Sequence, residues 1–188
     1  MLECRDMGFA KLDTYQNDVS DEVKKLVVNE KREKKSMDAE SIENLVSGLE
    51  NFGGIFDADQ LDRVKILDLP VSLIINNDGH WLSIYIDQKS FEIMDSLGLT
   101  ACKNLDKKLC RFICAHSYGK HFIATPKIQS DTSKSCGKFA ASFLYFRTIT
   151  SKNLKTFSTI FSQDLAKNEK ILDEIFQTIK KIHLKFSK

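Results

Sequence analysis

Three short apolar segments close together in the chain restrict the fold more than any other feature of this sequence. Residues 71–75 form an apolar run of the length expected for a buried strand, and residues 81–87 alternate between apolar and more polar side chains. Residues 91–95 repeat the strand-like composition, and both gaps between the segments, 76–79 and 87–90, have the composition of tight turns. The sequence therefore predicts three consecutive antiparallel strands in one sheet.

Helical periodicity is found on both sides of these strands. Residues 38–49 place apolar side chains at the i, i+3, i+4 and i+7 positions of one helix face, namely Ile42, Leu45, Val46 and Leu49. Residues 104–114 have a similar apolar stripe, whereas residues 138–149 are apolar on most sides, which is typical of a buried helix. An amphipathic pattern also predicts a last helix over residues 163–186.

Two shorter features complete the expected architecture. Gly53 and Gly54 follow the first helix and are interpreted as the turn that ends it. Residues 121–125 have the composition of one further strand, stopped by Pro126. The expected class is α+β, with a central and mainly antiparallel sheet packed between helices and with Cys136 at the N-terminus of a buried helix.

The length and composition predict one domain with an appendage. At 188 residues, of which 42% are hydrophobic, the chain can bury one sizeable core. Residues 1–35 precede the clearly periodic region and end in a charged segment, so they are interpreted as an N-terminal extension with a charged linker. Residues 36–188 form the predicted domain.

Composition also limits the cellular setting and the partners. The 28 basic and 26 acidic residues give a formal charge of +2, which carries no strong signal for a polyanion partner. A Lys-rich C-terminus nevertheless keeps nucleic acid open as a second kind of partner. No apolar run approaches the ~20 residues of a membrane span, and the first residues lack the layout of a secretory signal. The 5 cysteines have no framework spacing, which favours a reducing compartment.

Cys136 is singled out by its position in the chain. It precedes the buried helical run, where the helix dipole and unpaired backbone N–H groups lower the pKa of a thiol. Gly137 follows it and lets a substrate carbonyl approach the backbone closely. Together these features predict a nucleophilic thiolate at Cys136, with Gly137 as a substrate contact.

His80 and Asp95 supply the other groups that a thiol-dependent hydrolase needs. His80 opens a predicted strand and is the predicted general base for Cys136. Asp95 ends the next strand and runs back alongside His80 if the two strands form a hairpin, so it is the predicted orienting carboxylate. Asp78 and Asp87 are rivals for this role, but Asp78 lies in the turn beside His80 and Asp87 at the far end of the strand.

Gln129 lies in the polar segment that leads to Cys136. It is predicted to donate its side-chain amide to an oxyanion, together with the backbone N–H of Cys136. Trp81 is predicted to be half core and half wall of a substrate-binding cleft. The chemistry of these residues points to a cysteine protease with a Cys–His–Asp triad and a Gln in its oxyanion hole.

These motifs resemble the adenovirus-type (adenain-like) maturation proteases and, more distantly, the SUMO- and ubiquitin-like-protein-specific proteases. The resemblance covers residues 38–150 and rests on four motifs that occur in the same order, His80-Trp81, Asp95, Gln129 and Cys136-Gly137. It implies the fold of those proteases and the roles given above for these residues. It also implies a source in an adenovirus, a virophage or a Maverick or Polinton element.

The resemblance further implies a biological role. The substrates would be viral capsid or other structural precursors, cut after a small residue such as Gly during particle maturation. The enzyme would then act in the virion and in the cytoplasm or nucleus of the host cell. The sequence itself requires no cofactor. Tyr118 stands where the adenovirus enzymes have a cysteine that binds an activating peptide, so activation by that disulfide is not expected, and an activating peptide or DNA acting by another route stays open.

Three alternatives remain at the level of the sequence. A deubiquitinase or deSUMOylase-type isopeptidase, acting on ubiquitin-like modifiers of a host cell, would use the same residues. A non-catalytic binding domain that keeps the fold is the second alternative. The third is a zinc site, although the spacing of its four candidate ligands matches no usual structural zinc motif. These are Cys110, Cys114, His116 and His121.

Overall fold

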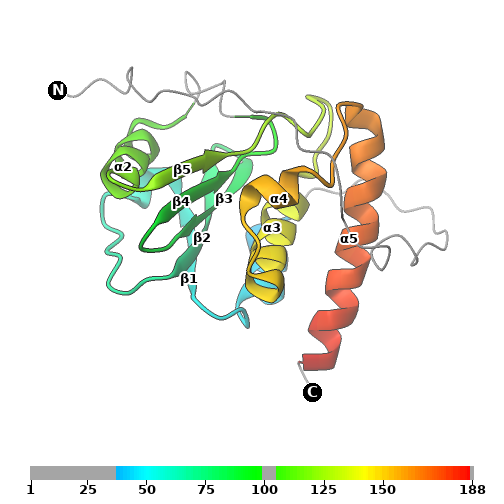
Figure 1. Ribbon diagram of the computed structural model, residues 1–188, viewed down its shortest axis with the longest axis horizontal. Coiled ribbons are helices and arrows are strands. Elements are labelled where there is room, and N and C mark those ends of the chain that lie inside the picture. Colours follow the sequence, from blue (N-terminus) through cyan, green and yellow to red (C-terminus); the bar gives the residue numbers. More distant parts are fainter. Residues whose placement is uncertain (1–36, 99–104, 187–188) are drawn as a thin grey trace.

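The computed structural model describes residues 37–98 and 105–186 (Figure 1). The predicted N-terminal extension, residues 1–35, lies outside the described residues. In chain order the elements are α1 (Ala39–Val46), β1 (Phe52–Asp57), the 3-10 helix η3 (Ala58–Gln60), β2 (Val71–Asn77), β3 (His80–Ile86), β4 (Ser90–Met94), α2 (Lys107–Ser117), β5 (His121–Ala124), α3 (Cys136–Thr150), α4 (Leu154–Ser158) and α5 (Leu165–Phe186).

The strands form one 5-stranded sheet in the order β1-β2-β3-β4-β5. Strand β3 pairs antiparallel with both β2 and β4, which confirms the three consecutive antiparallel strands predicted from the sequence. Strands β1 and β5 join the two edges in parallel, so the sheet is mixed rather than mainly antiparallel. The α+β class and the packing of the sheet between helices are confirmed.

Strand β1 corrects one prediction. Gly53 and Gly54 do not form a turn that ends α1, because they lie within β1 and α1 ends earlier. A Cβ at Gly53 would lie 2.7 Å from Val71 Cγ2 and 2.9 Å from Leu73 Cδ2, so a glycine is needed for this close approach to β2. A bulge separates Phe52 and Gly54 in the pairing with β2, and Gly54 has a φ of +126°, which favours glycine.

The hairpin between β2 and β3 fixes the position of His80. Asn77 pairs with His80, so the turn consists of Asp78 and Gly79 alone, with φ angles of 52° and 82°. Positive φ at both central residues is the geometry of the tight hairpin turn that Asp-Gly favours. The backbone N–H of Gly79 also donates to Asn76 Oδ1 at 2.9 Å. The predicted turn is confirmed, and it makes His80 the first residue of β3.

Helices cover both faces of the sheet (Figure 1). Helix α2 and η3 pack on one face, around a cluster of buried side chains that includes Leu82, Ile84 and Phe91. Helices α1, α3, α4 and α5 lie on the other face, around a second cluster that includes Trp81 and Phe139. In Figure 1, α3 lies next to the sheet and α5 lies outside α3. No helix within the described residues is long and apolar enough to cross a bilayer.

Helix α3 is buried over most of its length, as its composition predicts. It begins at Cys136, slightly earlier than predicted, and several of its side chains are 0% exposed, among them Phe139, Ala141, Phe143 and Leu144. The hydroxyl of Ser83 on β3, also 0% exposed, donates to the carbonyl of Ala140 at 3.1 Å. This hydrogen bond ties α3 to the middle strand of the sheet. Helix α4 was not predicted, because 5 residues are too few to show a period.

Candidate active site

His80 and Asp95 form a hydrogen-bonded pair at one end of the β3–β4 hairpin. His80 Nε2 and Asp95 Oδ1 are 2.8 Å apart, and the side chains are 19% and 5% exposed. Ser83 pairs with Met94, so the chain leaving β4 at Asp95 runs toward the start of β3. Asp95 Oδ1 also accepts the backbone N–H of Leu97 at 3.0 Å. The carboxylate is therefore held in the orientation that meets the imidazole.

Neither of the two rival carboxylates is hydrogen-bonded to His80 in the described part of the chain. Asp78 lies exposed in the β2–β3 turn. Asp87 accepts two backbone N–H groups of its own turn and forms an ion pair with Arg147 at 3.3 Å. Of the three carboxylates considered from the sequence, the structure brings Asp95 to His80.

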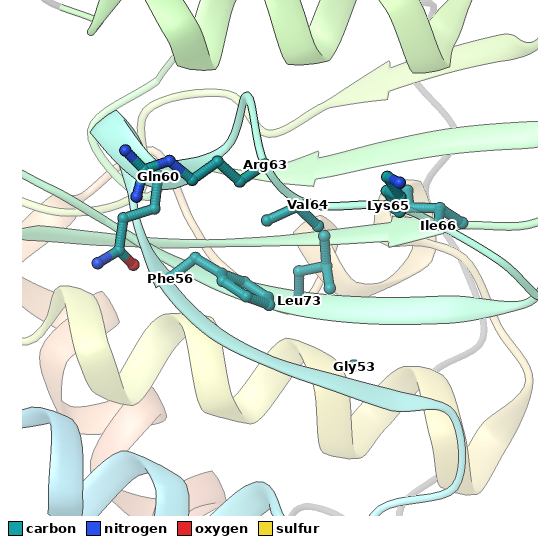
Figure 2. Close-up of a pocket in the computed structure, with 8 residues that line it drawn as sticks. All are labelled: Gly53, Phe56, Gln60, Arg63, Val64, Lys65, Ile66 and Leu73. Atoms are coloured by element: carbon teal, nitrogen blue, oxygen red, sulfur yellow. The ribbon is translucent and has the colours of Figure 1, made fainter.

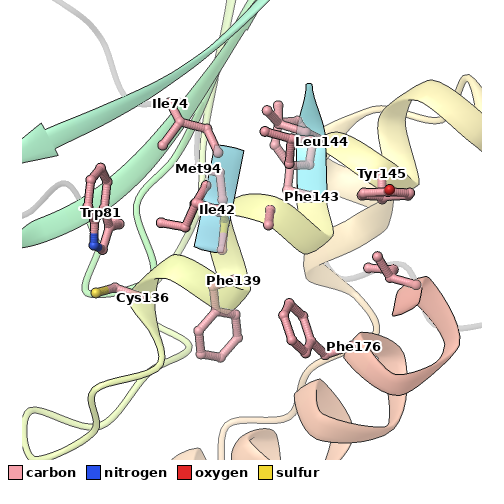
Figure 3. Close-up of a cluster of buried hydrophobic side chains, with 14 of the residues drawn as sticks. Ile42, Ile74, Trp81, Met94, Cys136, Phe139, Phe143, Leu144, Tyr145 and Phe176 are labelled. Carbon is pink, nitrogen blue, oxygen red and sulfur yellow. The ribbon is translucent and has the colours of Figure 1, made fainter. Parts of the chain in front are cut away.

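Cys136 begins α3 and meets the other side of His80. The sulfur is hydrogen-bonded to the His80 side chain and to backbone groups of Trp81 and Gly137. Because His80 uses Nε2 for Asp95, Nδ1 is the ring nitrogen left for Cys136. Figure 3 shows Cys136 and Trp81 together at the edge of the buried cluster around α3. Cys136 is 8% exposed, so the thiol lies largely out of water.

The surroundings shift the pKa values of both groups toward an ion pair. Burial raises the pKa of the Cys136 thiol, but hydrogen bonds from His80 and from backbone N–H groups outweigh burial and lower this pKa below its ordinary value. Burial lowers the pKa of His80, but hydrogen bonds with Asp95 and Cys136 outweigh it and raise this pKa to about 9. Both shifts act in the direction of a thiolate–imidazolium pair.

Gln129 is held at both ends of its side-chain amide. Its Oε1 accepts the hydroxyl of Ser96 at 2.5 Å, and its Nε2 donates to the carbonyl of Ser133 at 2.9 Å. The backbone N–H of Gln129 donates to the Ser96 carbonyl at 2.9 Å, and the residue is 2% exposed. Gln129 thus lies beside the strand end that carries Asp95, and the second N–H of its amide has no partner among the described residues. Its role at an oxyanion stays a prediction.

Trp81 and Gly137 both take part in packing beside the site. The indole N–H of Trp81 donates to the carbonyl of Met37 at 3.1 Å, and the residue is 8% exposed. The Trp81 side chain is therefore mostly buried. A Cβ at Gly137 would lie 3.1 Å from both Met37 Cβ and Ile42 Cδ1, so glycine lets α1 pack closely on α3. The substrate contacts expected of Trp81 and Gly137 stay predictions.

Two polar residues that support the site were missed in the sequence. Thr125 Oγ1 accepts the backbone N–H of Asp95 at 2.8 Å, and Ser96 orients Gln129 as described above. Thr125 directly follows β5, and Ser96 is the second residue after the end of the neighbouring strand β4. Polar side chains at adjacent strand ends are the signal that would have indicated them.

Two hollows open on the surface of the described part of the protein. A hollow of about 410 Å³ lies beside β1 and β2 and is lined by residues that include Phe56, Val64 and Leu73 (Figure 2). A second, of about 400 Å³, borders β5 and α4. Neither contains a residue of the candidate site. No group of three or more His, Cys, Asp or Glu side chains in the described part of the chain is arranged to hold a metal ion. The four residues of the alternative zinc site therefore form no such group, namely Cys110, Cys114, His116 and His121.

No family model matches the chain, and no curated protein matches it. Among solved structures, the central domain of the uncharacterized Lpg1148 protein from Legionella pneumophila is similar over 78% of this chain and 98% of that chain, with 13% identity and a TM-score of 0.48. The SUMO protease Ulp1, with its catalytic cysteine oxidized to a sulfenic acid, is similar over 82% of this chain and 80% of that chain, with 14% identity and a TM-score of 0.46. A de-sumoylating protease is similar over 83% of this chain and 73% of that chain, with 18% identity and a TM-score of 0.38. Likenesses at this level do not by themselves assign a family or an activity to the chain.

Proposed function

We propose that this chain is a cysteine protease in which Cys136 is the nucleophile, His80 the general acid and base, and Asp95 the group that orients His80. The observation that carries the proposal is the convergence of three side chains from separate elements. His80 is hydrogen-bonded to both Asp95 and Cys136, and the pKa of His80 is raised while that of Cys136 is lowered. A thiolate with an oriented imidazole is the combination that thiol-dependent hydrolysis of an amide uses.

The reaction follows from these groups in two halves. The Cys136 sulfur attacks the carbonyl carbon of the scissile peptide, and the carbonyl electrons move onto oxygen. As the C–N bond breaks, the proton on His80 passes to the leaving amine, and a thioester remains on Cys136. Neutral His80 then takes a proton from water while the water oxygen attacks the thioester. Expulsion of the sulfur releases the acid product and restores the thiolate and the imidazolium.

The negative oxygen that forms in both halves needs hydrogen-bond donors. The backbone N–H of Cys136 is in the first turn of α3, where no intrahelical acceptor exists. In this proposal the free N–H of the Gln129 amide is the second donor. Ser96 and Ser133 already fix the orientation of that amide, so little reorganisation would be needed when the oxyanion forms.

The finer part of the proposal concerns the substrate. The resemblance to adenovirus-type proteases suggests a viral capsid or other structural precursor, cut after a small residue such as Gly, in the virion or the infected cell. The proposed steps use only residues of this chain. DNA or a peptide would act as an activator of the enzyme and would take no part in these steps. Host ubiquitin-like modifiers would be cut by the same chemistry, so they belong to the substrate test.

The chemistry is tested first, with an electrophilic peptide that ends in Gly-Gly and with mass mapping of the modified cysteine. We expect modification at Cys136 that is lost in His80→Ala. A Cys110→Ala variant controls for general thiol reactivity and should be labelled as the wild type is. Labelling spread over the cysteines, or absent at Cys136, would contradict the proposal.

The substrate is tested next, with Gly-containing capsid peptides and with ubiquitin and SUMO carrying a C-terminal fluorophore. Each panel is run with and without added DNA. We expect cleavage of the capsid peptides by the wild type and none by Cys136→Ala. Release of the fluorophore from ubiquitin or SUMO, with no cleavage of the peptides, would overturn the viral substrate and leave the chemistry in place.

A further inference from the structure

Ser135 departs from the pattern that other helices of this protein follow at their N-termini. Helices α1, α2 and α4 are capped by side chains that accept a first-turn backbone N–H, those of Asp38, Asp106 and Asn153. Their ψ angles are 169°, 142° and 172°. Ser135, the N-cap of α3, has a ψ of 9° and makes no side-chain cap hydrogen bond. The side chain that would ordinarily cap this helix is therefore used for something else.

The hydroxyl of Ser135 donates instead to Glu169 on α5. Ser135 Oγ and Glu169 Oε2 are 2.7 Å apart, and Ser135 is 9% exposed. The other carboxylate oxygen, Glu169 Oε1, is buried and has no hydrogen-bond partner within the described part of the chain. A carboxylate in this position loses hydration, and its hydrogen bond with Ser135 offsets part of that loss. The contact is thus directional and holds the hydroxyl away from α3.

The residue before Glu169 strengthens the same link. Asn168 is 0% exposed, and its Nδ2 donates to the carbonyl of Ile128 at 3.0 Å. Ile128 directly precedes Gln129, just as Ser135 directly precedes Cys136. Two adjacent residues of α5 therefore hold both ends of the loop that joins the predicted oxyanion donor to the nucleophile.

We infer, on the basis of the proposed function, that Glu169 is a positioning residue that keeps the Ser135 hydroxyl from capping α3, so that the first-turn N–H groups serve the Cys136 sulfur and the oxyanion. Gly137 is the second residue of α3, and its backbone N–H bonds the sulfur. An N-cap hydroxyl binds the N–H of the second or third helical residue. Without the hydrogen bond to Glu169, the backbone of Ser135 would adopt the extended conformation of the other N-cap residues. Its hydroxyl would then accept the Gly137 N–H, which would no longer be available to the thiolate.

The test compares the reactivity of Cys136 in three variants of this contact. Glu169→Ala releases Ser135, Glu169→Gln keeps an oxygen that accepts the hydroxyl, and Glu169→Ala combined with Ser135→Ala leaves no hydroxyl to cap the helix. Glu174→Ala, on the same helix, is the control. The rate of alkylation of Cys136 by iodoacetamide is measured against pH with mass mapping, because this readout needs no substrate. Steady-state kinetics on a cleaved peptide follow.

Glu169→Ala is expected to raise the pKa of Cys136 by about one pH unit and to lower kcat about tenfold, with KM changed less than about twofold, since one hydrogen bond to a charged group is lost. Glu169→Gln should keep most of the wild-type reactivity. The double variant should regain the low pKa of Cys136 and most of kcat. A contact that only stabilised the fold would leave the double variant at least as impaired as Glu169→Ala.

The outcomes separate this inference from the proposed function. An ordinary thiol pKa for Cys136 in the wild type would overturn both. A low pKa in the wild type that is unchanged in Glu169→Ala, or not regained in the double variant, would overturn the inference alone. If Glu169→Ala fails to fold, Ser135→Ala alone decides the matter. It should keep the low pKa of Cys136, because no hydroxyl is left to compete, and a raised pKa in this variant would overturn the inference.

Discussion

Replacing Asp95 by Asn removes the charge from the His80 pair while keeping the hydrogen bonds. An Asn oxygen can accept the same two groups that Asp95 Oδ1 accepts, the His80 ring at 2.8 Å and the Leu97 N–H at 3.0 Å. The side chains have the same shape, so the packing around this largely buried position is kept. Asp95→Asn is therefore a change in electrostatics at a nearly constant structure.

The size of the effect follows from the pKa of His80. This pKa is about 9 against 6.5 for an ordinary His, which corresponds to roughly 3 kcal/mol in favour of the charged imidazole. Burial acts in the opposite direction, and the hydrogen bond and charge of Asp95 are leading causes of the increase. Without that charge the pKa of His80 should fall by at least about one pH unit. The pKa of the Cys136 thiol should rise, because the charged form of its partner His80 is less favoured.

The assay is the pH dependence of peptide hydrolysis and of Cys136 alkylation. In the wild type, activity should rise as Cys136 loses its proton and should fall as His80 loses its own, near pH 9. In Asp95→Asn the alkaline limb should move down by at least about one pH unit. The higher pKa of Cys136 should lower kcat/KM at neutral pH by about tenfold, because less of the thiol is ionised there. Asp78→Asn removes a charge from the exposed turn beside His80 and should leave both limbs unchanged. An alkaline limb that stays near pH 9 in Asp95→Asn would refute this reasoning.

The remaining predictions concern Gln129, Gly53 and Arg147. Gln129→Ala should lower kcat about 100-fold with little change in KM in steady-state kinetics, because one oxyanion donor is lost, and a change confined to KM would contradict this. Gly53→Ala should destabilise the fold by about 1–3 kcal/mol in urea unfolding, because its Cβ would lie 2.7 Å from a side chain of β2. Gly48→Ala is the control and should not destabilise the fold, because a Cβ there has nothing within 4 Å. Arg147→Met should cost about 3–5 kcal/mol in the same assay, because Glu92, 0% exposed, loses its ion pair at 3.1 Å, and a loss below about 1 kcal/mol would contradict this.

The centre of the sheet and the cluster around Cys136 could be predicted because their signals are local. Alternation along β3 and an Asp-Gly turn indicate the hairpins that put His80 and Asp95 at one end of the sheet. The apolar run that follows Cys136 indicates a buried helix with this residue near its start. Both signals need only residues that are neighbours in the chain or in one hairpin.

The parts that could not be predicted depend on contacts between distant segments. Strand β1 pairs in parallel with β2, so Gly53 and Gly54 resemble a turn until the strand beside them is known. The Trp81 indole is fixed by a carbonyl 44 residues away, and Ser135 bonds a residue 34 positions further along the chain. No periodicity or turn composition marks such partners, because tertiary packing alone brings them together.

The hydrogen bond between Ser83 and Ala140 joins the strand that begins at His80 to the helix that begins at Cys136. Because this bond lies in the fully buried core, we expect thermal motion to displace the imidazole and the sulfur together. Their separation should then not depend on the closure of a surface loop. The alkylation rate of Cys136 should accordingly follow a single smooth temperature dependence up to the cooperative melting of the domain, with no earlier transition in which the site alone comes apart.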